Sequence, residues 1–202
     1  MFPHLTFRLP ENAGVVYLND RIEELDLEQA LMSVSRQRRE QALRYRMERD
    51  RRLSVAAYLL LCEALREEYG MTELPQLDYG TNGKPFILNH PSIHFNLSHC
   101  EEAAVCVVSR QPVGVDIESI SRYDAELCFS TMSVREQNLI AQSPEPAVAF
   151  IRLWTMKESL LKLSGEGLRD DLATILEQTD NIRFTTQTNA TRGYIYSVCQ
   201  KL

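Results

Sequence analysis

Hydrophobic positions in this chain follow two spacings, one typical of strands and one typical of helices. Short apolar runs bounded by turn residues predict strands. They lie at residues 14–18, 93–98, 103–109, 113–118, 182–188 and 193–199. Longer segments with apolar side chains at three- and four-residue intervals predict helices at residues 133–142 and 146–163.

A long helical region is predicted between residues 27 and 69, which are rich in alanine, leucine, arginine and glutamate. Ser54 precedes the apolar stretch VAAYLLLCEAL, so we expect it to cap a second, buried helix over residues 54–69. Gly70 is placed to end that helix.

Strands and helices occur in both halves of the chain in a loosely similar order. This favours an α+β fold with two subdomains, which we place at residues 1–111 and 112–202. A turn cluster, YGTNGKP at residues 79–85, interrupts the first half.

Composition indicates an ordinary globular protein, since 44% of the 202 residues are hydrophobic and 25% are charged. No apolar run reaches the roughly 20 residues that cross a bilayer, and the segment MFPHLTFRLPEN does not resemble a secretory signal. The five cysteines are scattered and form no C-x-x-C pair, which favours reduced thiols in the cytoplasm over disulfides or a zinc site.

The charge distribution says more than the net charge of −6, which disfavours nucleic acid as a partner. Eight of the 22 basic residues are arginines between Arg36 and Arg52. Such a run is usually a solvated helix face, and it can also form a local anion site on an acidic protein.

The segment WTMKESLLKLSGEGL, residues 154–168, places Glu158 four residues before Lys162 in a helix with much apolar surface. An exposed pair in this order contributes only a few tenths of a kcal/mol, about 0.2–0.5. Taken alone, the segment is ordinary amphipathic helix.

The strand VGVDIE has two acidic residues on one face, because alternate side chains of a strand share a face. Val115 and Ile117 can then enter a core, while Asp116 and Glu118 lie side by side. Neighbouring carboxylates repel, so either one takes up a proton or a cation lies between them. Oxygen ligands that leave room for water and phosphate suit Mg²⁺. A half-exposed strand with a polar face remains the simpler alternative.

Two further segments carry polar side chains suited to phosphate. In NLSHC, Ser98 and His99 follow a strand and can donate hydrogen bonds, although a lone histidine is more often structural. In NGKP, Gly83 lets the backbone approach a ligand and Lys84 supplies a positive charge. Each motif alone could be an ordinary loop or turn.

Together, GKP, NLSH, GVDIE, WTMKESLLK and GEGL, in this order and spacing, resemble the phosphopantetheinyl transferases of the surfactin-synthetase-activating, two-subdomain type. The resemblance extends from about Arg38 to Leu168. It implies two similar α/β subdomains related by a pseudo-two-fold axis, with coenzyme A in the cleft between them. It also implies transfer of the phosphopantetheine arm to a serine of an apo acyl or peptidyl carrier protein by a monomer that needs no membrane.

By matching position, the resemblance implies a Mg²⁺ site at Asp116, Glu118 and Glu158, with the coenzyme A pyrophosphate. Glu158 is also the implied base for the carrier serine, and Lys162 meets the phosphate, so that Asp116, Glu158 and Lys162 form the implied catalytic set. The residues implied at the nucleotide and its extra ribose phosphate are Arg38, Arg44, Ser54, Lys84, Ser98 and His99.

The chain departs from the family at two positions: Cys100 replaces a common Ser or Thr, and Gln41 replaces a common lysine near the nucleotide phosphate. Glu136 matches another acidic position, and we expect either a support near the carrier-protein face or a solvated helix residue. Gly165 and Gly167 either let the backbone approach the pantetheine arm or simply end the helix.

Two other functions remain open from the sequence. One is a different magnesium-dependent phosphohydrolase or nucleotidyl transferase, although neither G-x-x-x-x-G-K-[ST] nor H-x-D is present. The other is a non-catalytic module that binds coenzyme A or a carrier protein. A degenerate copy should have lost Asp116, Glu158 or Lys162, and all three remain.

Overall fold

The computed structural model describes residues 3–165, 172–177 and 179–202. The strands are β1 (Leu5–Arg8), β2 (Val15–Asn19), β3 (Leu77–Tyr79), β4 (Pro85–Ile87), β5 (His94–His99), β6 (Ala104–Ser109), β7 (Val113–Ser119), β8 (Ile182–Asn189) and β9 (Tyr194–Lys201). The helices are α1 (Leu27–Met32), α2 (Arg36–Leu43), α3 (Glu48–Tyr69), α4 (Ala125–Thr131), α5 (Val134–Gln142) and α6 (Pro146–Ser164). In the described part of the chain, no helix is long and apolar enough to span a membrane.

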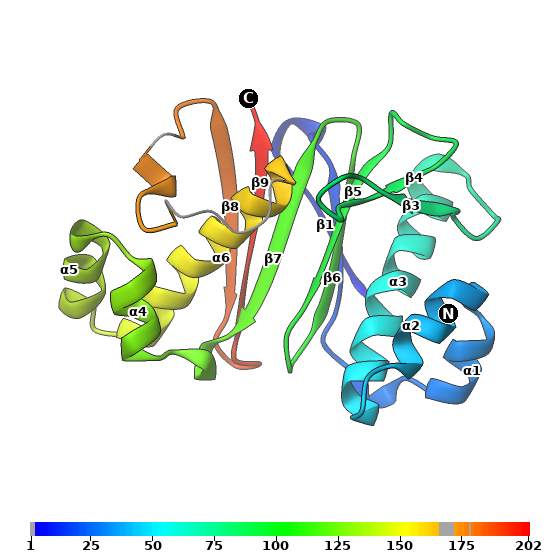
Figure 1. Ribbon diagram of the computed structural model, residues 1–202, viewed down its shortest axis with the longest axis horizontal. Helices are drawn as coiled ribbons and strands as arrows, with labels where there is room; N and C mark the ends of the chain where they lie inside the picture. Colours follow the sequence, from blue (N-terminus) through cyan, green and yellow to red (C-terminus); the bar gives the residue numbers. More distant parts are fainter. Residues whose placement is uncertain (1–2, 166–171, 178) are drawn as a thin grey trace.

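Two antiparallel sheets form the centre of the molecule (Figure 1). The first has the strand order β1-β2-β6-β5 and the second β7-β9-β8, while β3 and β4 form a separate hairpin. Helix α3 packs on the first sheet and α6 on the second, so each sheet has one long helix on its outer side. The mixed α/β architecture predicted from the sequence is confirmed, whereas the two-fold relation and the subdomain boundaries stay predictions.

The inner faces of the two sheets pack against each other through one apolar cluster. Val16 and Val107 of the first sheet meet Val115, Ile117 and Val198 of the second sheet in it. The intervening residues of β2 and β6 face α3 and belong to a second cluster. Strands buried on both faces read as continuous apolar runs, which explains the unbroken AVCVV of β6.

Helix α3 begins earlier than the sequence suggested, so the prediction that Ser54 caps a helix is wrong. The helix runs from Glu48, and Ser54 is buried in its interior. The preceding residues are mostly charged and carry no apolar signal, so the pattern starts only at Leu53. The predicted end is confirmed, because Gly70 adopts the left-handed conformation (φ 69°) and donates to the Arg66 carbonyl.

The segments that the sequence did not predict are short. β1 is an edge strand with all four residues exposed, and the β3–β4 hairpin has three residues in each strand. Strands this short or this exposed show no apolar alternation in the sequence. Such strands are stabilised by pairing with neighbouring strands.

Candidate active site

The two sheets meet along the edges of β5 and β7, and polar side chains gather at this junction. The Asn96 side chain of β5 accepts a hydrogen bond from the backbone N–H of Val115 on β7 (2.9 Å). Because β5 and β7 are edge strands of separate sheets, side chains rather than ladder hydrogen bonds join them here.

Asp116, Ser98 and Lys162 form a closed hydrogen-bonded group at this junction. Lys162 Nζ of α6 lies 2.7 Å from Asp116 Oδ1 and 2.8 Å from Ser98 Oγ, and the Ser98 hydroxyl donates to the same Asp116 oxygen at 2.9 Å. Asp116 is buried, and its Oδ2 has no hydrogen-bond partner among the described residues. A buried carboxylate oxygen in this state is suited to a cation or to a donor on a ligand.

Glu118 and Glu158 lie close enough to Asp116 for their charges to interact. Burial and then the charge of Asp116 raise the pKa of Glu118, while the Arg122 guanidinium, 2.5 Å away, opposes the rise. Burial and then Asp116 also raise the pKa of Glu158, and Lys162 opposes that rise. The face of β7 opposite the shared apolar cluster therefore carries an excess of negative charge, as the alternation in VGVDIE predicted.

A cavity of about 360 Å³ opens beside these groups. Glu158 and Lys162 line it from α6, Lys84 from the turn before β4, and Asn96 from β5. Residues four positions apart share one face of a helix, and here that face borders the cavity.

A second cavity, of about 410 Å³, is lined by some of the residues expected at the nucleotide. Its lining consists of Arg38, Gln41, Arg44, Tyr45, Ser54 and Tyr79. Arg38 donates from Nη2 to the Ser54 carbonyl (2.6 Å) and lies over the Tyr58 ring, 5.5 Å from its centroid. Burial lowers the pKa of this guanidinium. Three of the predicted nucleotide residues, Arg38, Arg44 and Ser54, thus border one cavity.

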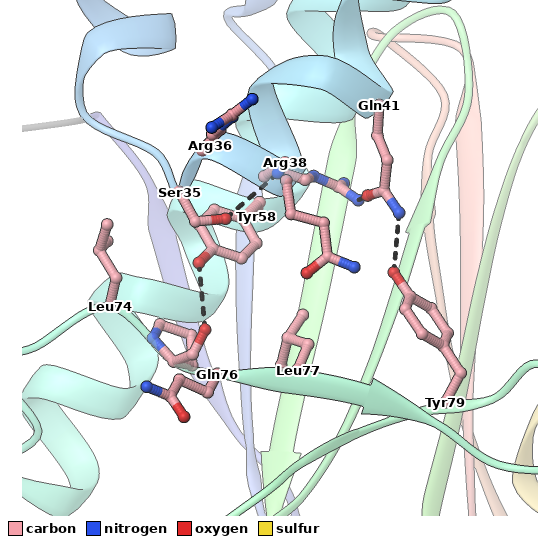
Figure 2. Close-up of a pocket in the computed structure, with 11 residues that line it drawn as sticks. Ser35, Arg36, Arg38, Gln41, Tyr58, Leu74, Gln76, Leu77 and Tyr79 are labelled. Carbon is pink, nitrogen blue, oxygen red and sulfur yellow. Dashed lines mark hydrogen bonds between the residues drawn. The ribbon is translucent and has the colours of Figure 1, made fainter.

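Gln41 connects Arg38 to the β3–β4 hairpin. Its Oε1 accepts from Arg38 Nη1 at 3.4 Å, and its Nε2 donates to the Tyr79 hydroxyl at 2.9 Å (Figure 2). Arg38, Gln41 and Tyr79 also line a neighbouring cavity of about 410 Å³ that extends to Leu74 and Leu77 (Figure 2).

His99 is the last residue of β5. Burial, followed by the positive charges of Lys162 and Arg38, lowers its pKa and favours neutral imidazole. Next to it, the Cys100 thiol is buried and donates to Glu102 Oε2 at 3.3 Å. Gly165 ends α6 in the left-handed conformation (φ 70°), while Gly167 lies outside the described residues.

Lys84 is placed differently from the other residues expected at the nucleotide. It lines the cavity beside Glu158, and its Nζ donates to the carbonyls of Leu163 (3.0 Å) and Val113 (3.4 Å). Burial lowers its pKa.

Glu136 is not a solvated helix residue, so that expectation is corrected, whereas a support near the carrier-protein face stays a prediction. It is buried, its Oε2 lies 2.7 Å from Lys157 Nζ, and it completes a capping box with Ser133 at the start of α5. The Lys157 side chain is fully buried. Its ammonium also donates to three backbone carbonyls, those of Thr131, Leu172 and Ala173, each at 2.9 Å. The sequence gives no signal for this pair because its members are 21 positions apart.

Comparisons with known proteins point to one family. Residues 22–111 match the family model described as 4′-phosphopantetheinyl transferase, N-terminal, and residues 112–200 match that of the 4′-phosphopantetheinyl transferase superfamily. The 4′-phosphopantetheinyl transferase psf-1 of Bacillus pumilus is 36% identical over 155 residues. A 4′-phosphopantetheinyl transferase of Bacillus subtilis is 30% identical over 157 residues.

The chain belongs to the 4′-phosphopantetheinyl transferase superfamily. The matched regions cover 75% and 76% of this chain, and 66% and 70% of the two relatives' own length. The Sfp transferase of Bacillus subtilis strain 168, 27% identical over 157 residues, matches 76% of the chain. The family and enzyme class predicted from the sequence are thereby confirmed, and the roles of single residues stay predictions.

Asp116, Glu118 and Glu158 suit the divalent metal that the family resemblance implies. They are hard oxygen donors, one has an unpartnered buried oxygen, and burial and mutual repulsion disfavour charge on the other two. As placed, their oxygens are not gathered for coordination. In the described part of the chain, only His4, Glu63 and Glu67 bring three candidate ligand atoms within 4.8 Å of one another.

Proposed function

We propose that this chain transfers the 4′-phosphopantetheine arm of coenzyme A to a serine hydroxyl of an apo acyl or peptidyl carrier protein. The serine oxygen attacks the phosphorus that bears the pantetheine arm. The bond from that phosphorus to the bridging oxygen breaks, and adenosine 3′,5′-bisphosphate leaves. The family match supports the reaction class, and the group around Asp116, Glu158 and Lys162 supports the location.

Glu158 is proposed to accept the proton of the carrier serine, directly or through water. A carboxylate can act as a general base when it lies within hydrogen-bond reach of the proton that it accepts. Glu158 borders the cavity together with Lys162, so a substrate phosphate bound there would lie near both side chains.

Lys162 is proposed to neutralise charge on the pyrophosphate. Its ammonium already holds Asp116 and Ser98 and is 29% exposed, so it remains accessible to a ligand. Phosphoryl-type transfer depends mainly on alignment and charge neutralisation, which a fixed ammonium supplies.

The proposed magnesium ligands are Asp116, Glu118 and Glu158. When bound, the ion would supply charge neutralisation at the pyrophosphate. The proposed nucleotide-binding residues are Arg38, Arg44, Ser54, Ser98 and His99, of which Arg38, Arg44 and Ser54 share one cavity. Lys84 borders the other cavity, beside Glu158 and Lys162. We further propose a monomer in the cytoplasm, with no nucleic-acid partner.

Intact-mass measurement of apo carrier proteins tests the proposal. Carriers from fatty-acid, polyketide and peptide synthetases are incubated with coenzyme A, Mg²⁺ and the protein, with a chelator arm and a carrier whose serine is replaced by alanine. We expect the phosphopantetheine mass on at least one carrier, and on neither control. An unmodified serine across the whole panel would overturn the reaction.

The Lys162→Met variant tests the location of the site. We expect kcat/KM to fall by about 100-fold or more, because a charge that stabilises the transition state is lost. Because Asp116 is buried and loses its ammonium partner, the variant should also be less stable, so circular dichroism is used to confirm that it is folded at the assay temperature. Equal activity of the variant and the unmodified protein would remove Lys162 from the mechanism.

A further inference from the structure

We propose that Lys84 is a positioning residue, which fastens the C-terminal end of α6 to the start of β7 and thereby holds Lys162 and Asp116 in register. This inference rests on the proposed function, because it assigns Lys84 a part in that same site. It differs from the sequence-based prediction, which assigned Lys84 to the nucleotide.

The two carbonyls that Lys84 contacts belong to the two elements that carry the site. Leu163 lies in the last turn of α6, directly after Lys162, and Val113 opens β7 three residues before Asp116. Carbonyls in the last turn of a helix have no partner within the helix, and a cation there also interacts favourably with the helix dipole. One ammonium from a distant turn therefore connects both elements.

The stem of Lys84 adds packing to these hydrogen bonds. Gly165 continues the chain after α6 in the left-handed conformation, and a Cβ atom built there would lie 3.2 Å from Lys84 Cδ. The aliphatic stem thus covers the helix end. Gly83, just before the lysine, has φ 79° and shapes the turn from which the side chain extends.

Most of the hydrogen-bond donors of the Lys84 ammonium are already used within the protein. An ammonium has three hydrogens, and two of them are directed at carbonyls. Lys84 also borders a different cavity from the one that Arg38, Arg44 and Ser54 line. The side chain is therefore committed to the protein rather than to the nucleotide cavity.

The test uses the Lys84→Met variant and, in parallel, Lys84→Gln, which keeps a polar end but is too short to reach both carbonyls. Hydrogen exchange is followed at the Gly165 amide, which donates to the Leu161 carbonyl (2.9 Å) and so reports on the end of α6. Steady-state kinetics are measured with coenzyme A and with 3′-dephospho-coenzyme A. Lys201→Met, an exposed lysine at the end of β9, is the matched control.

We expect both Lys84 variants to exchange faster at Gly165, and kcat to fall about tenfold with either donor while KM changes less than about threefold. The Lys201 variant should match the unmodified protein. A rise in KM confined to coenzyme A would make Lys84 a ligand of the ribose phosphate and overturn the inference. Unchanged exchange, whatever the kinetics, would overturn it as well.

The exchange measurement needs no substrate, so it separates the two proposals. If the unmodified protein modifies no carrier, the proposed function fails, and the exchange rate at Gly165 still decides whether Lys84 holds the helix end.

Discussion

Lys157 and Glu158 are neighbours in the chain, yet they face different surroundings on α6. Lys157 is fully buried against Glu136 and three backbone carbonyls, whereas Glu158 borders the cavity beside Lys162. One of the two lysines in the motif WTMKESLLK therefore stabilises the fold, and the other lies in the candidate site.

The Lys157→Met variant should be less stable by about 3–5 kcal/mol, because it leaves the buried Glu136 carboxylate without its counter-ion. Urea unfolding followed by circular dichroism measures this change. Removing the carboxylate as well, in Lys157→Met with Glu136→Met, should restore part of the loss. The exposed Lys201→Met serves as the control. If Lys157→Met were as stable as Lys201→Met, the importance of the buried pair would be contradicted.

The Glu158→Ala variant should lose activity without losing the fold. We expect kcat to fall by about 100-fold or more, since both a base and a charged ligand are removed. Glu126→Ala, in the exposed first turn of α4, is the control in the carrier mass assay. Unfolding of the Glu158 variant in circular dichroism would instead indicate a structural role.

At the residue scale, the sequence predicted the positions of side chains that are close in the chain. It did not predict contacts between residues that are far apart in the chain. The alternation in VGVDIE placed Val115 and Ile117 in the core and Asp116 on the other face, as the structure has them. The link from Ser98 to Lys162 spans 64 positions, and no local pattern encodes it. The family resemblance, rather than spacing, brought these residues together.

Between elements, α6 approaches β7 closely at Gly114. A Cβ atom at Gly114 would overlap the Ser159 carbonyl oxygen and lie 2.6 Å from the Leu163 backbone nitrogen. The glycine in GVDIE therefore lets the helix that carries Glu158 and Lys162 lie directly on the strand that carries Asp116.

The Gly114→Ala variant should be less stable by about 1–3 kcal/mol and less active, because the helix must move away from the strand. Gly80→Ala is the matched control, since a Cβ atom there meets only the Lys84 carbonyl at an ordinary 3.6 Å. Thermal unfolding and the carrier assay check both variants. An unchanged unfolding midpoint for Gly114→Ala would contradict the close packing.

Element boundaries were predictable where a cap is local. Ser133 and Glu136 form the capping box at the start of α5, and Gly70 ends α3, both within a residue or two of the predictions. Ser54 looked like a cap because charged residues precede it and apolar ones follow, yet tertiary packing extends the helix six residues further back. Single-sequence patterns do not contain that packing.

At the scale of the whole molecule, several arginines between Arg36 and Arg52 contact other parts of the protein. Arg36, Arg49 and Arg52 pair with carboxylates, whereas Arg39 and Arg51 donate to backbone carbonyls and keep an unbalanced charge. The segment from Arg36 to Arg52 therefore keeps a local positive charge on an acidic protein, and an acidic carrier protein should be attracted to it.

We expect the apparent KM for the carrier to rise with ionic strength, because salt screens this attraction. Arg39→Gln should weaken the salt dependence. Arg152→Gln, on α6 in the other half, should not. A KM for the carrier that does not change with salt would exclude electrostatic attraction by this region.

The apolar seam between the two sheets limits how the molecule can be divided. Because Val16 and Val107 pack against side chains of the other sheet, such as Val115 and Val198, a nascent N-terminal half leaves the ribosome with that face partly bare. Halves exchanged between relatives must therefore match in side-chain volume along this seam. The solubility of such chimaeras will depend on that match before the chemistry of the cleft matters.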